Sequence, residues 1–254
     1  MSTVSPPRSA SVRSTMTEQY APVLRVHADM LRECSPVVDP TAARRRIASG
    51  QVAFDALRVV RSCGDLTSRF VRVLAAFEVA GFVSNADRRA LLDKGLDVDD
   101  LVHGWFTGDR TPSDPRRRVA RQVAIVIGNA LLRGATERVG APSVWRTWTR
   151  VVCPCCGGAP DIALLERSQR ILVCARCDAQ WRAPRDGCLG CNATESPMEI
   201  ARISNPALGY DLVMCNSCGR FLKERPRRGL ASLLVERALT AELDLAAEQR
   251  GLRI

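Results

Sequence analysis

The residues best suited to chemistry in this sequence are its cysteines. Nine of the eleven lie between Cys153 and Cys218. Eight of these nine form four Cys-x-x-Cys pairs, which are Cys153 with Cys156, Cys174 with Cys177, Cys188 with Cys191, and Cys215 with Cys218. One such turn presents two sulfurs from a tight loop, and two turns complete a tetrahedral site for zinc or iron. The pattern therefore predicts two four-cysteine metal sites.

The gaps between neighbouring pairs indicate which loops share a metal. They are 17, 10 and 23 residues long. The first gap fits the spacing of a zinc ribbon well, and the last is slightly long. We therefore expect the first loop to pair with the second and the third with the fourth. An interleaved arrangement, first with third and second with fourth, stays open.

The residue after each second cysteine supports a metal-binding knuckle. The four positions are occupied by small or turn-forming residues, namely Gly157, Asp178, Asn192 and Gly219. In a knuckle the backbone here often turns to positive φ, so that amide N–H groups point at the sulfurs. Gly, Asn and Asp tolerate that conformation best.

Other roles for the cysteines fit less well. Disulfides need an oxidising compartment, and the chain shows no apolar secretory segment. A redox dithiol needs one Cys-x-x-Cys in a strand-to-helix setting, not four between short strand-like runs. Cys155 is interpreted as a variable loop residue, with spare ligand, redox partner and sulfur acceptor as open alternatives. Cys34 and Cys63 are expected to be small buried apolar residues.

Signs of catalysis are missing from the sequence. It has two histidines, and both are expected to be structural: His27 lies on an apolar helical face, and His103 precedes Gly104-Trp105. We find no Gly-rich phosphate loop and no nucleophile elbow. A hydrolytic metal site keeps one position open for water, whereas paired cysteines close both sites. We therefore expect no enzyme activity.

Composition and charge narrow the classes of protein to which the chain could belong. The chain has 254 residues, 46% of them hydrophobic, and its mean hydropathy of −0.06 fits a soluble protein. No run approaches the roughly 18 apolar residues that span a bilayer, so we expect no membrane insertion and a cytoplasmic location. Of the net charge of +10, most lies in residues 1–149, with 22 basic and 15 acidic residues. Residues 150–225 hold 10 and 8, which argues against nucleic acid as their partner.

The helices and strands expected along the chain, which must position the cysteines, indicate an α+β protein. It consists of an N-terminal all-α helical bundle followed by tandem rubredoxin-like or zinc-ribbon modules and a C-terminal helix. The expected parts are a disordered tail (1–16), the helical bundle (17–149), a first four-cysteine module (150–186), a second four-cysteine module (187–226) and the C-terminal helix (227–254).

Helical periodicity and caps predict about six helices in the bundle. One begins at Pro40 and extends towards Cys63, and the last extends from Asp114-Pro115 towards Arg138. That last helix is apolar over most of its circumference, which is typical of a central helix. Short strands are expected within the two modules, at 161–165, 170–173, 198–204 and 208–214.

Residues 153–254 resemble the formate dehydrogenase accessory protein FdhE family. The motifs that carry the resemblance are Cys153-Pro-Cys-Cys156-Gly157 with Pro160, Arg170-Ile-Leu-Val-Cys174-Ala-Arg-Cys177, Trp181, Arg185, Cys188-Leu-Gly-Cys191, Tyr210 and Cys215-Asn-Ser-Cys218-Gly219-Arg-Phe-Leu-Lys223. The final Ala/Leu-rich helix is also similar to the family's C-terminal segment. The helical half matches the family only in character and size.

This resemblance implies a cytoplasmic maturation factor rather than a catalyst. Family members bind iron through rubredoxin-like cysteine motifs and contact the catalytic subunit of a molybdenum-dependent formate dehydrogenase. Carried onto this chain, the metal ligands are the eight paired cysteines, with iron in two tetrathiolate sites and zinc as the alternative. The sequence leaves the oligomeric state open, with a homodimer among the options.

Two other functions are kept as alternatives. A zinc-ribbon nucleic-acid-binding protein would bind DNA or RNA in a strongly salt-dependent way. A dithiol oxidoreductase would use one loop with Cys155 as the resolving thiol, and it requires a solvent-accessible thiol of low pKa.

Overall fold

The computed structural model describes residues 8–33, 37–93, 96–107, 114–140, 142–166, 169–183, 187–191, 200–227 and 232–253. The chain divides into two compact units, which we describe separately. The first unit comprises Met1–Glu18, Ala159–Ala175 and Gln180–Ile254, and the second comprises Gln19–Gly158 and Arg176–Ala179. The predicted fold class is confirmed, since a helical N-terminal region precedes a mixed sheet with two tetracysteine clusters and C-terminal helices.

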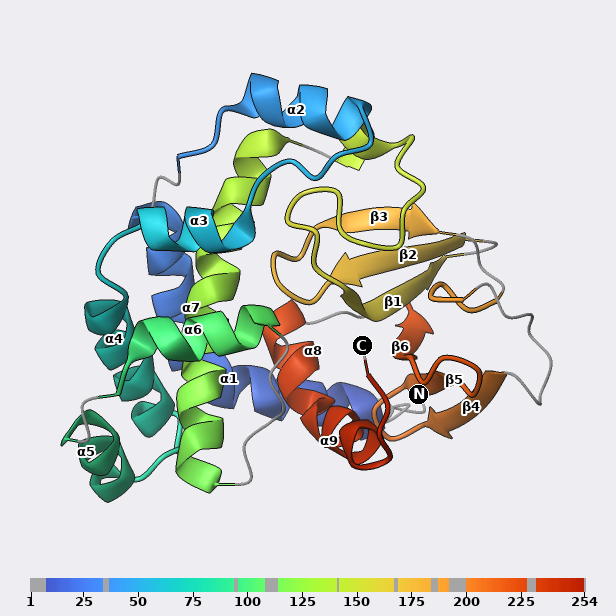
Figure 1. The fold of residues 1–254 in the computed structure, drawn as a ribbon. Coiled ribbons are helices and arrows are strands. Elements are labelled where there is room, and N and C mark those ends of the chain that lie inside the picture. Colours follow the sequence, from blue (N-terminus) through green and yellow to red (C-terminus); the bar gives the residue numbers. More distant parts are fainter. Residues whose placement is uncertain are drawn as a thin grey trace, which may run out of the picture. The chain divides into compact units, whose positions relative to one another are not determined.

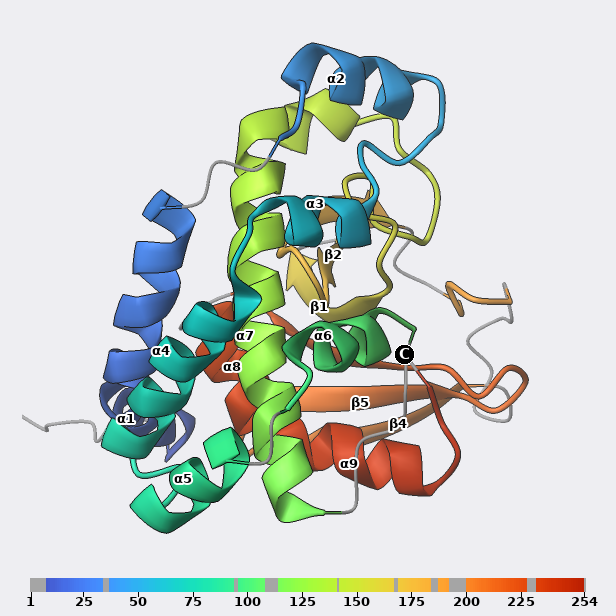
Figure 2. The same ribbon diagram turned by 60° about the vertical axis from the view of Figure 1, so that its left-hand side comes forward.

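The second unit is built around one long helix. Its helices are α2 (Pro40–Ala48), α3 (Ala56–Ser62), α4 (Leu66–Val79), α5 (Asn85–Asp93), α6 (Val98–Thr107), α7 (Pro115–Val139) and the 3₁₀ helix η1 (Pro142–Trp145), with most of α1 (Arg8–Glu33). Helices α2 to α6 all pack against α7 (Figures 1 and 2). This arrangement confirms that α7 is the central helix, and Asp114 caps it as predicted by accepting from the amides of Arg116 and Arg117.

Close packing of α6 on α7 depends on a glycine. A Cβ atom added to Gly128 would lie 2.1 Å from a ring carbon of Trp105. The indole therefore occupies the space that any side chain at this position of α7 would need. Interiors packed this tightly do not yield room for an extra carbon without movement of the neighbouring elements.

Two predictions about the helical region are wrong, one about the extent of a helix and one about the length of the N-terminal tail. The helix expected from Pro40 towards Cys63 is two helices, because Gly50 adopts a φ of 76° after α2, and Asp55 then caps α3 by accepting from the amide of Arg58. The tail is also shorter than predicted. Residues 8–16 are helical within α1, whereas residues 1–7 lie outside the described part of the chain.

A buried ion pair explains the helical start of α1. The guanidinium of Arg13 is 2.9 Å from a carboxylate oxygen of Glu236, and both side chains are largely buried. Arg13 also donates to the carbonyl of Leu208. The Ser- and Thr-rich composition of this segment gives no sign of partners so distant in sequence, so the sequence alone predicts a disordered tail.

The first unit contains a six-stranded mixed sheet (Figure 1). Its strands are β1 (Pro160–Glu166), β2 (Gln169–Cys174), β3 (Gln180–Ala183), β4 (Ile200–Asn205), β5 (Tyr210–Cys215) and β6 (Phe221–Pro226), in the order β3-β2-β1-β6-β5-β4. All neighbouring strands are antiparallel except β1 and β6, whose parallel pairing joins the two cysteine-bearing halves. The sequence predicts β1, β2, β4 and β5 but not β3, β6 or this pairing.

The sequence does not predict strand β6 because the residues at its centre are charged. Lys223, Glu224 and Arg225 are all buried, and each is ion-paired. Lys223 lies 2.7 Å from Asp244, Glu224 lies 2.7 Å from Arg170, and Arg225 lies 2.8 Å from Glu236. Buried charges are tolerated when they are paired in this way.

The C-terminal region forms two helices rather than one. They are α8 (Leu233–Leu239) and α9 (Ala241–Gln249), and they meet at Thr240. Leu233 of α8 and Leu243 of α9 pack on a sheet core that includes Ile162, Leu164 and Tyr210. Among the described residues, no helix has the length and hydropathy required to cross a membrane.

Candidate metal centres

The structure groups the eight paired cysteines into two clusters. The first contains Cys153, Cys156, Cys174 and Cys177, and the second contains Cys188, Cys191, Cys215 and Cys218. Within each cluster all four sulfur atoms lie within 4.8 Å of one another. The loops are therefore grouped sequentially, first with second and third with fourth, and the interleaved arrangement does not occur.

The sulfur separations fit a tetrahedral ion. Four sulfurs at about 2.3 Å from a central metal would lie about 3.8 Å apart. The sulfurs of Cys153 and Cys177 are 3.5 Å apart, those of Cys188 and Cys218 are 3.5 Å apart, and those of Cys191 and Cys215 are 3.6 Å apart. Both clusters could therefore hold a metal ion with little movement of the loops.

The backbone of the loops has the conformation expected of metal knuckles. Positive φ values occur at Gly157 (72°), Asp178 (59°) and Gly219 (67°), which are three of the four predicted positions; the fourth, Asn192, lies outside the described residues. Amide groups also point at sulfur, since the N–H of Cys155 donates to Cys153 at 3.3 Å. The corresponding amide of Gly190 donates to Cys188 at the same distance.

The two clusters differ in exposure. In the first cluster all four cysteines are buried. In the second, Cys215 is buried, Cys188 and Cys218 are half-buried, and Cys191 is exposed. A metal in the first cluster would be shielded from water, whereas a metal in the second would be open to solvent on the side of Cys191.

The thiols of the second cluster have unequal acidity. Burial works to raise the pKa of Cys215, but hydrogen bonds from the amides of Cys218 and Ser217 and from neighbouring thiols overcome it and lower the pKa to about 7. Burial raises the pKa of Cys218 to about 12. A thiol that ionises near neutral pH is a ready first donor for a metal, since the thiolate is the ligand form.

An asparagine that the sequence analysis missed supports the first cluster. Asn129, in the middle of α7, is 1% exposed. Its amide nitrogen donates to the carbonyl of Arg176 at 3.0 Å and to the carboxylate of Asp178 at 3.1 Å. Arg176 and Asp178 flank the ligand Cys177, so Asn129 fixes the second knuckle. The sequence feature that could have indicated this role is the presence of a polar residue within an otherwise apolar helix.

His27 completes this network as a structural residue, as predicted. Its ring nitrogen Nε2 lies 2.8 Å from the side-chain oxygen of Asn129. Since the amide nitrogen of Asn129 donates elsewhere, its oxygen must accept, and the neutral imidazole carries its hydrogen on Nε2. Burial lowers the pKa of His27 below its ordinary value of 6.5. The imidazole is therefore held in its neutral form.

The other cysteines and the second histidine lie outside the clusters. Cys155 is buried, as is every member of the first cluster, and its carbonyl accepts from the amide of Phe54 at 3.1 Å. Cys63 is half-buried rather than buried, and Cys34 lies outside the described residues. His103 is exposed on α6.

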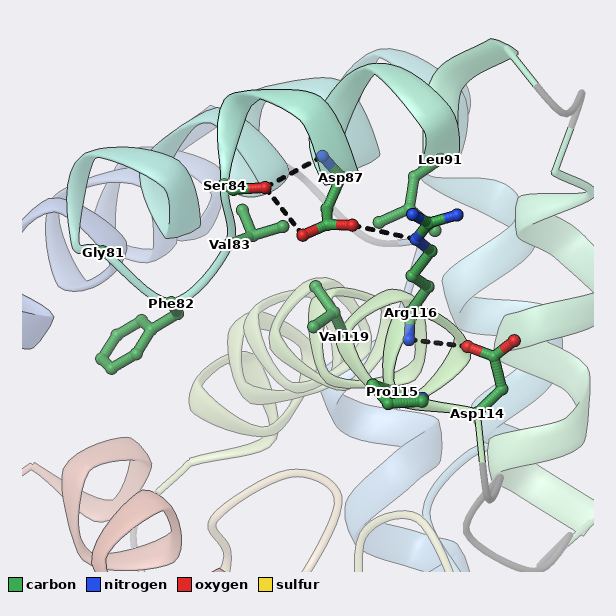
Figure 3. A pocket seen from close by; sticks show the side chains of 10 residues that line it. All are labelled: Gly81, Phe82, Val83, Ser84, Asp87, Leu91, Asp114, Pro115, Arg116 and Val119. Atoms are coloured by element: carbon green, nitrogen blue, oxygen red, sulfur yellow. Dashed lines mark hydrogen bonds and ion pairs between the residues drawn. The ribbon is translucent and has the colours of Figure 1, made fainter.

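The second unit also contains a cavity of about 860 Å³ between α5 and α7 (Figure 3). Its polar side chains are engaged with one another or with helix ends. Asp87 accepts from the hydroxyl of Ser84 at 2.7 Å and from Arg116 at 2.9 Å, and these contacts lower the pKa of Asp87. Asp114 caps α7. These groups serve helix capping, so the cavity does not supply a reactive constellation.

The fold and clusters define a class of protein, one whose helical N-terminal region precedes a mixed sheet with two tetracysteine clusters that could bind metal ions. No family model matches the chain. A curated protein from Pasteurella multocida (strain Pm70), named "Protein FdhE homolog", is 25% identical over 108 residues, covering 40% of this chain and 35% of that protein. The match thus spans about a third of the curated relative's length.

A solved structure extends the likeness to the whole fold. The crystal structure of the FdhE protein from Pseudomonas aeruginosa matches with a TM-score of 0.68 at 19% identity, over 97% of this chain and 92% of that chain. The predicted resemblance to the FdhE family is confirmed. The chain therefore has an FdhE-like fold.

Proposed function

We propose that the chain is a metal-binding maturation factor for a molybdenum-dependent formate dehydrogenase. In this role it binds the catalytic subunit of that enzyme and supports its assembly or activation, without catalysing a reaction itself. The observation that carries the proposal is the pair of tetracysteine clusters on an FdhE-like fold. The eight paired cysteines are the proposed ligands, with four ligands for each ion.

The chemistry of the clusters supports a docking role. Four thiolates close the coordination sphere, so a bound ion has no free position for a substrate or water. The ion instead fixes the two short loops that supply its ligands. Rigid loops of defined shape are suited to the recognition of a partner protein.

Iron is the proposed metal, and zinc is the alternative. Both ions accept four thiolates in tetrahedral geometry. Elemental analysis of protein purified anaerobically from a host supplied with both metals distinguishes them. We expect about two irons per chain, one for each cluster, together with sulfur-to-iron charge-transfer absorption. Two colourless zincs would make the clusters purely structural, and protein without metal would contradict the proposal.

Binding of the client is tested separately. A tagged chain in cells that produce formate dehydrogenase should retain the catalytic subunit after stringent washing. The double variant Cys174→Ser, Cys177→Ser removes two sulfurs from the first cluster and should abolish this retention. The matched control is Cys63→Ser, which changes a cysteine outside both clusters. Undiminished retention by the double variant would contradict the claim that intact clusters are needed for binding.

A further inference from the structure

One surface of the second unit carries arginines without acidic neighbours along the chain. Residues 40–52 and 138–150 hold six arginines and no aspartate or glutamate. All six side chains are exposed, and we call them the basic surface: Arg44, Arg45, Arg46, Arg138, Arg146 and Arg150. The two segments adjoin, because α2 packs on both α7 and η1. Both ribbon views place α2 beside the C-terminal end of α7 (Figures 1 and 2).

Three of these arginines are anchored to backbone carbonyl groups. Arg44 donates through Nε to Val139 at 2.8 Å, and Arg46 donates through Nε to Val52 at 2.8 Å. Arg150 donates through one Nη to Gly50 at 3.0 Å. Each guanidinium has five N–H donors, so one anchoring hydrogen bond uses only part of its capacity. The guanidinium of Arg150 also lies over the ring of Trp148, 5.5 Å from the ring centroid. The positive groups are held in place before any partner arrives, which lowers the entropic cost of binding.

The carboxylates that flank the two segments are already engaged. Asp39 caps α2, and Asp55 caps α3. Glu137 accepts from Arg133 at 3.0 Å. The nearest acidic groups in the sequence therefore serve helix ends or another arginine, and the local excess of positive charge stays available to a partner of opposite charge.

The form of the basic surface favours an acidic protein over a nucleic acid. The aromatic residues of the segments, Trp145 and Trp148, are only 3% and 6% exposed, so they offer no platform for stacking bases. Guanidinium groups fixed close to the surface suit carboxylates on a facing protein.

We infer that the basic surface is an electrostatic docking site for an acidic surface of a partner protein. This inference rests on the proposed function, which supplies that partner as the formate dehydrogenase catalytic subunit. Charge at the rim of an interface acts mainly on the association rate and on its salt dependence. The tetracysteine loops and the basic surface would then contribute separately to recognition.

Binding kinetics of purified, metal-loaded chain to the purified catalytic subunit test the inference. The variant Arg45→Glu, Arg138→Glu, Arg146→Glu alters three exposed side chains that make no ion pair within the described residues. We expect it to slow association about tenfold or more at 50 mM salt and to flatten the salt dependence. A neutral version with glutamine should give an intermediate loss, and it keeps the test valid if reversed charges disturb the helix ends.

The control places the same charge change elsewhere in the same unit. Arg25→Glu, Arg89→Glu, Arg117→Glu alters three other exposed arginines, and Arg117 lies at the opposite end of α7, roughly 30 Å from Val139 along the helix. We expect association within about twofold of the unaltered chain. Equal losses in both variants would overturn the inference and indicate a general effect of net charge.

The remaining outcomes separate the inference from the proposed function. If the unaltered chain binds the subunit and the basic-surface variant binds equally well, the inference fails and the proposed function stands. If the unaltered chain does not bind at all, both fail. A 20-nucleotide RNA or a 20-base-pair DNA duplex serves as the competing probe. One result would overturn the inference in favour of nucleic acid. In that result, either probe displaces the subunit and binds the chain more tightly than the subunit does, with an affinity that depends on the six arginines.

Discussion

The two tetracysteine clusters share their sulfur geometry but differ in their surroundings. The first is buried, and hydrogen bonds support the backbone of both its loops. The amide of Ala53 donates to the carbonyl of Pro154 at 2.9 Å, and Asn129 donates to the carbonyl of Arg176 and to the carboxylate of Asp178 on either side of Cys177. The second cluster has Cys191 exposed. The same ligand set is thus placed once in a fixed interior and once at a surface.

This difference suggests a division of roles. Strands β1 and β2 are also held by other contacts, because the guanidinium of Arg237 donates to the carbonyl of Cys174 at 2.8 Å and pairs with Asp161 at 2.7 Å. A metal there would contribute to folding. In the second cluster, the backbone amide of Arg253 donates to the carbonyl of Gly219 at 2.8 Å, which ties the fourth loop to the segment that follows α9. A metal there would mainly order surface loops.

The largest expected effect comes from removing one cluster at a time. The double variant Cys174→Ser, Cys177→Ser can no longer hold an ion in the buried first cluster. A structural metal in such a site can supply on the order of 10 kcal/mol to folding. We expect this variant to lose cooperative thermal unfolding. Cys188→Ser, Cys191→Ser should lower the midpoint by only about 5 °C, because these positions are closer to solvent.

Circular dichroism melts of the two double variants, with metal content measured in parallel, provide the comparison. Each variant should retain about half of the metal that the unaltered chain binds. Equal destabilisation by the two variants would show that exposure does not distinguish the clusters.

Metal removal should show the next largest difference. In the presence of excess chelator, the second cluster should release its ion at least about tenfold faster than the first, because exposed sites open locally at lower free energy. Release followed by a chromogenic chelator should therefore be biphasic, with half of the amplitude in each phase. In Cys188→Ser, Cys191→Ser the fast phase should disappear. A single phase in the unaltered chain would mean that the clusters exchange alike.

A smaller effect is expected from the asparagine that holds the second knuckle. Asn129→Ala leaves the carbonyl of Arg176, the carboxylate of Asp178 and the imidazole of His27 without this partner. Unsatisfied buried polar groups cost about 1–3 kcal/mol each, and partial relaxation reduces the sum. We expect a loss of about 2–3 kcal/mol in unfolding free energy and faster metal release from the first cluster alone.

The control for this change is an asparagine at the surface of the same unit. The side chain of Asn85 donates to Glu78 at 2.6 Å in a solvent-exposed hydrogen bond. Asn85→Ala should change the unfolding free energy by less than about 0.5 kcal/mol. If Asn129→Ala behaves in the same way, the network around the first cluster has no supporting role.

The cysteine pairs and the positive-φ positions were predictable because they depend on local spacing and on residue type. Most helices were predictable for the same reason, through periodicity and caps such as Asp114. The parallel pairing of β1 with β6 was not, since it joins residues about 60 apart in sequence and β6 contains Lys223, Glu224 and Arg225. Their partners lie on other elements, so no local pattern marks β6 as a strand. The support from Asn129 was missed for the same reason.

The smallest effect concerns pH and again distinguishes the clusters. Burial lowers the pKa of His27 in the folded chain, while the unfolded chain titrates near 6.5. Below pH 6.5 the unfolded state therefore binds more protons than the folded state. The contribution of neutral His27 to stability is full above pH 6.5 and falls as the pH decreases. The slope of this fall is at most about 1.4 kcal/mol per pH unit. His27→Gln keeps a donor to Asn129 without titrating. Unfolding free energies measured between pH 5 and 8 should therefore vary less in this variant. Release from the first cluster should be accelerated less at low pH, and the acceleration that remains should come from protonation of the cysteine thiolates. An unchanged pH profile would mean that protonation of His27 is not coupled to the knuckle it supports.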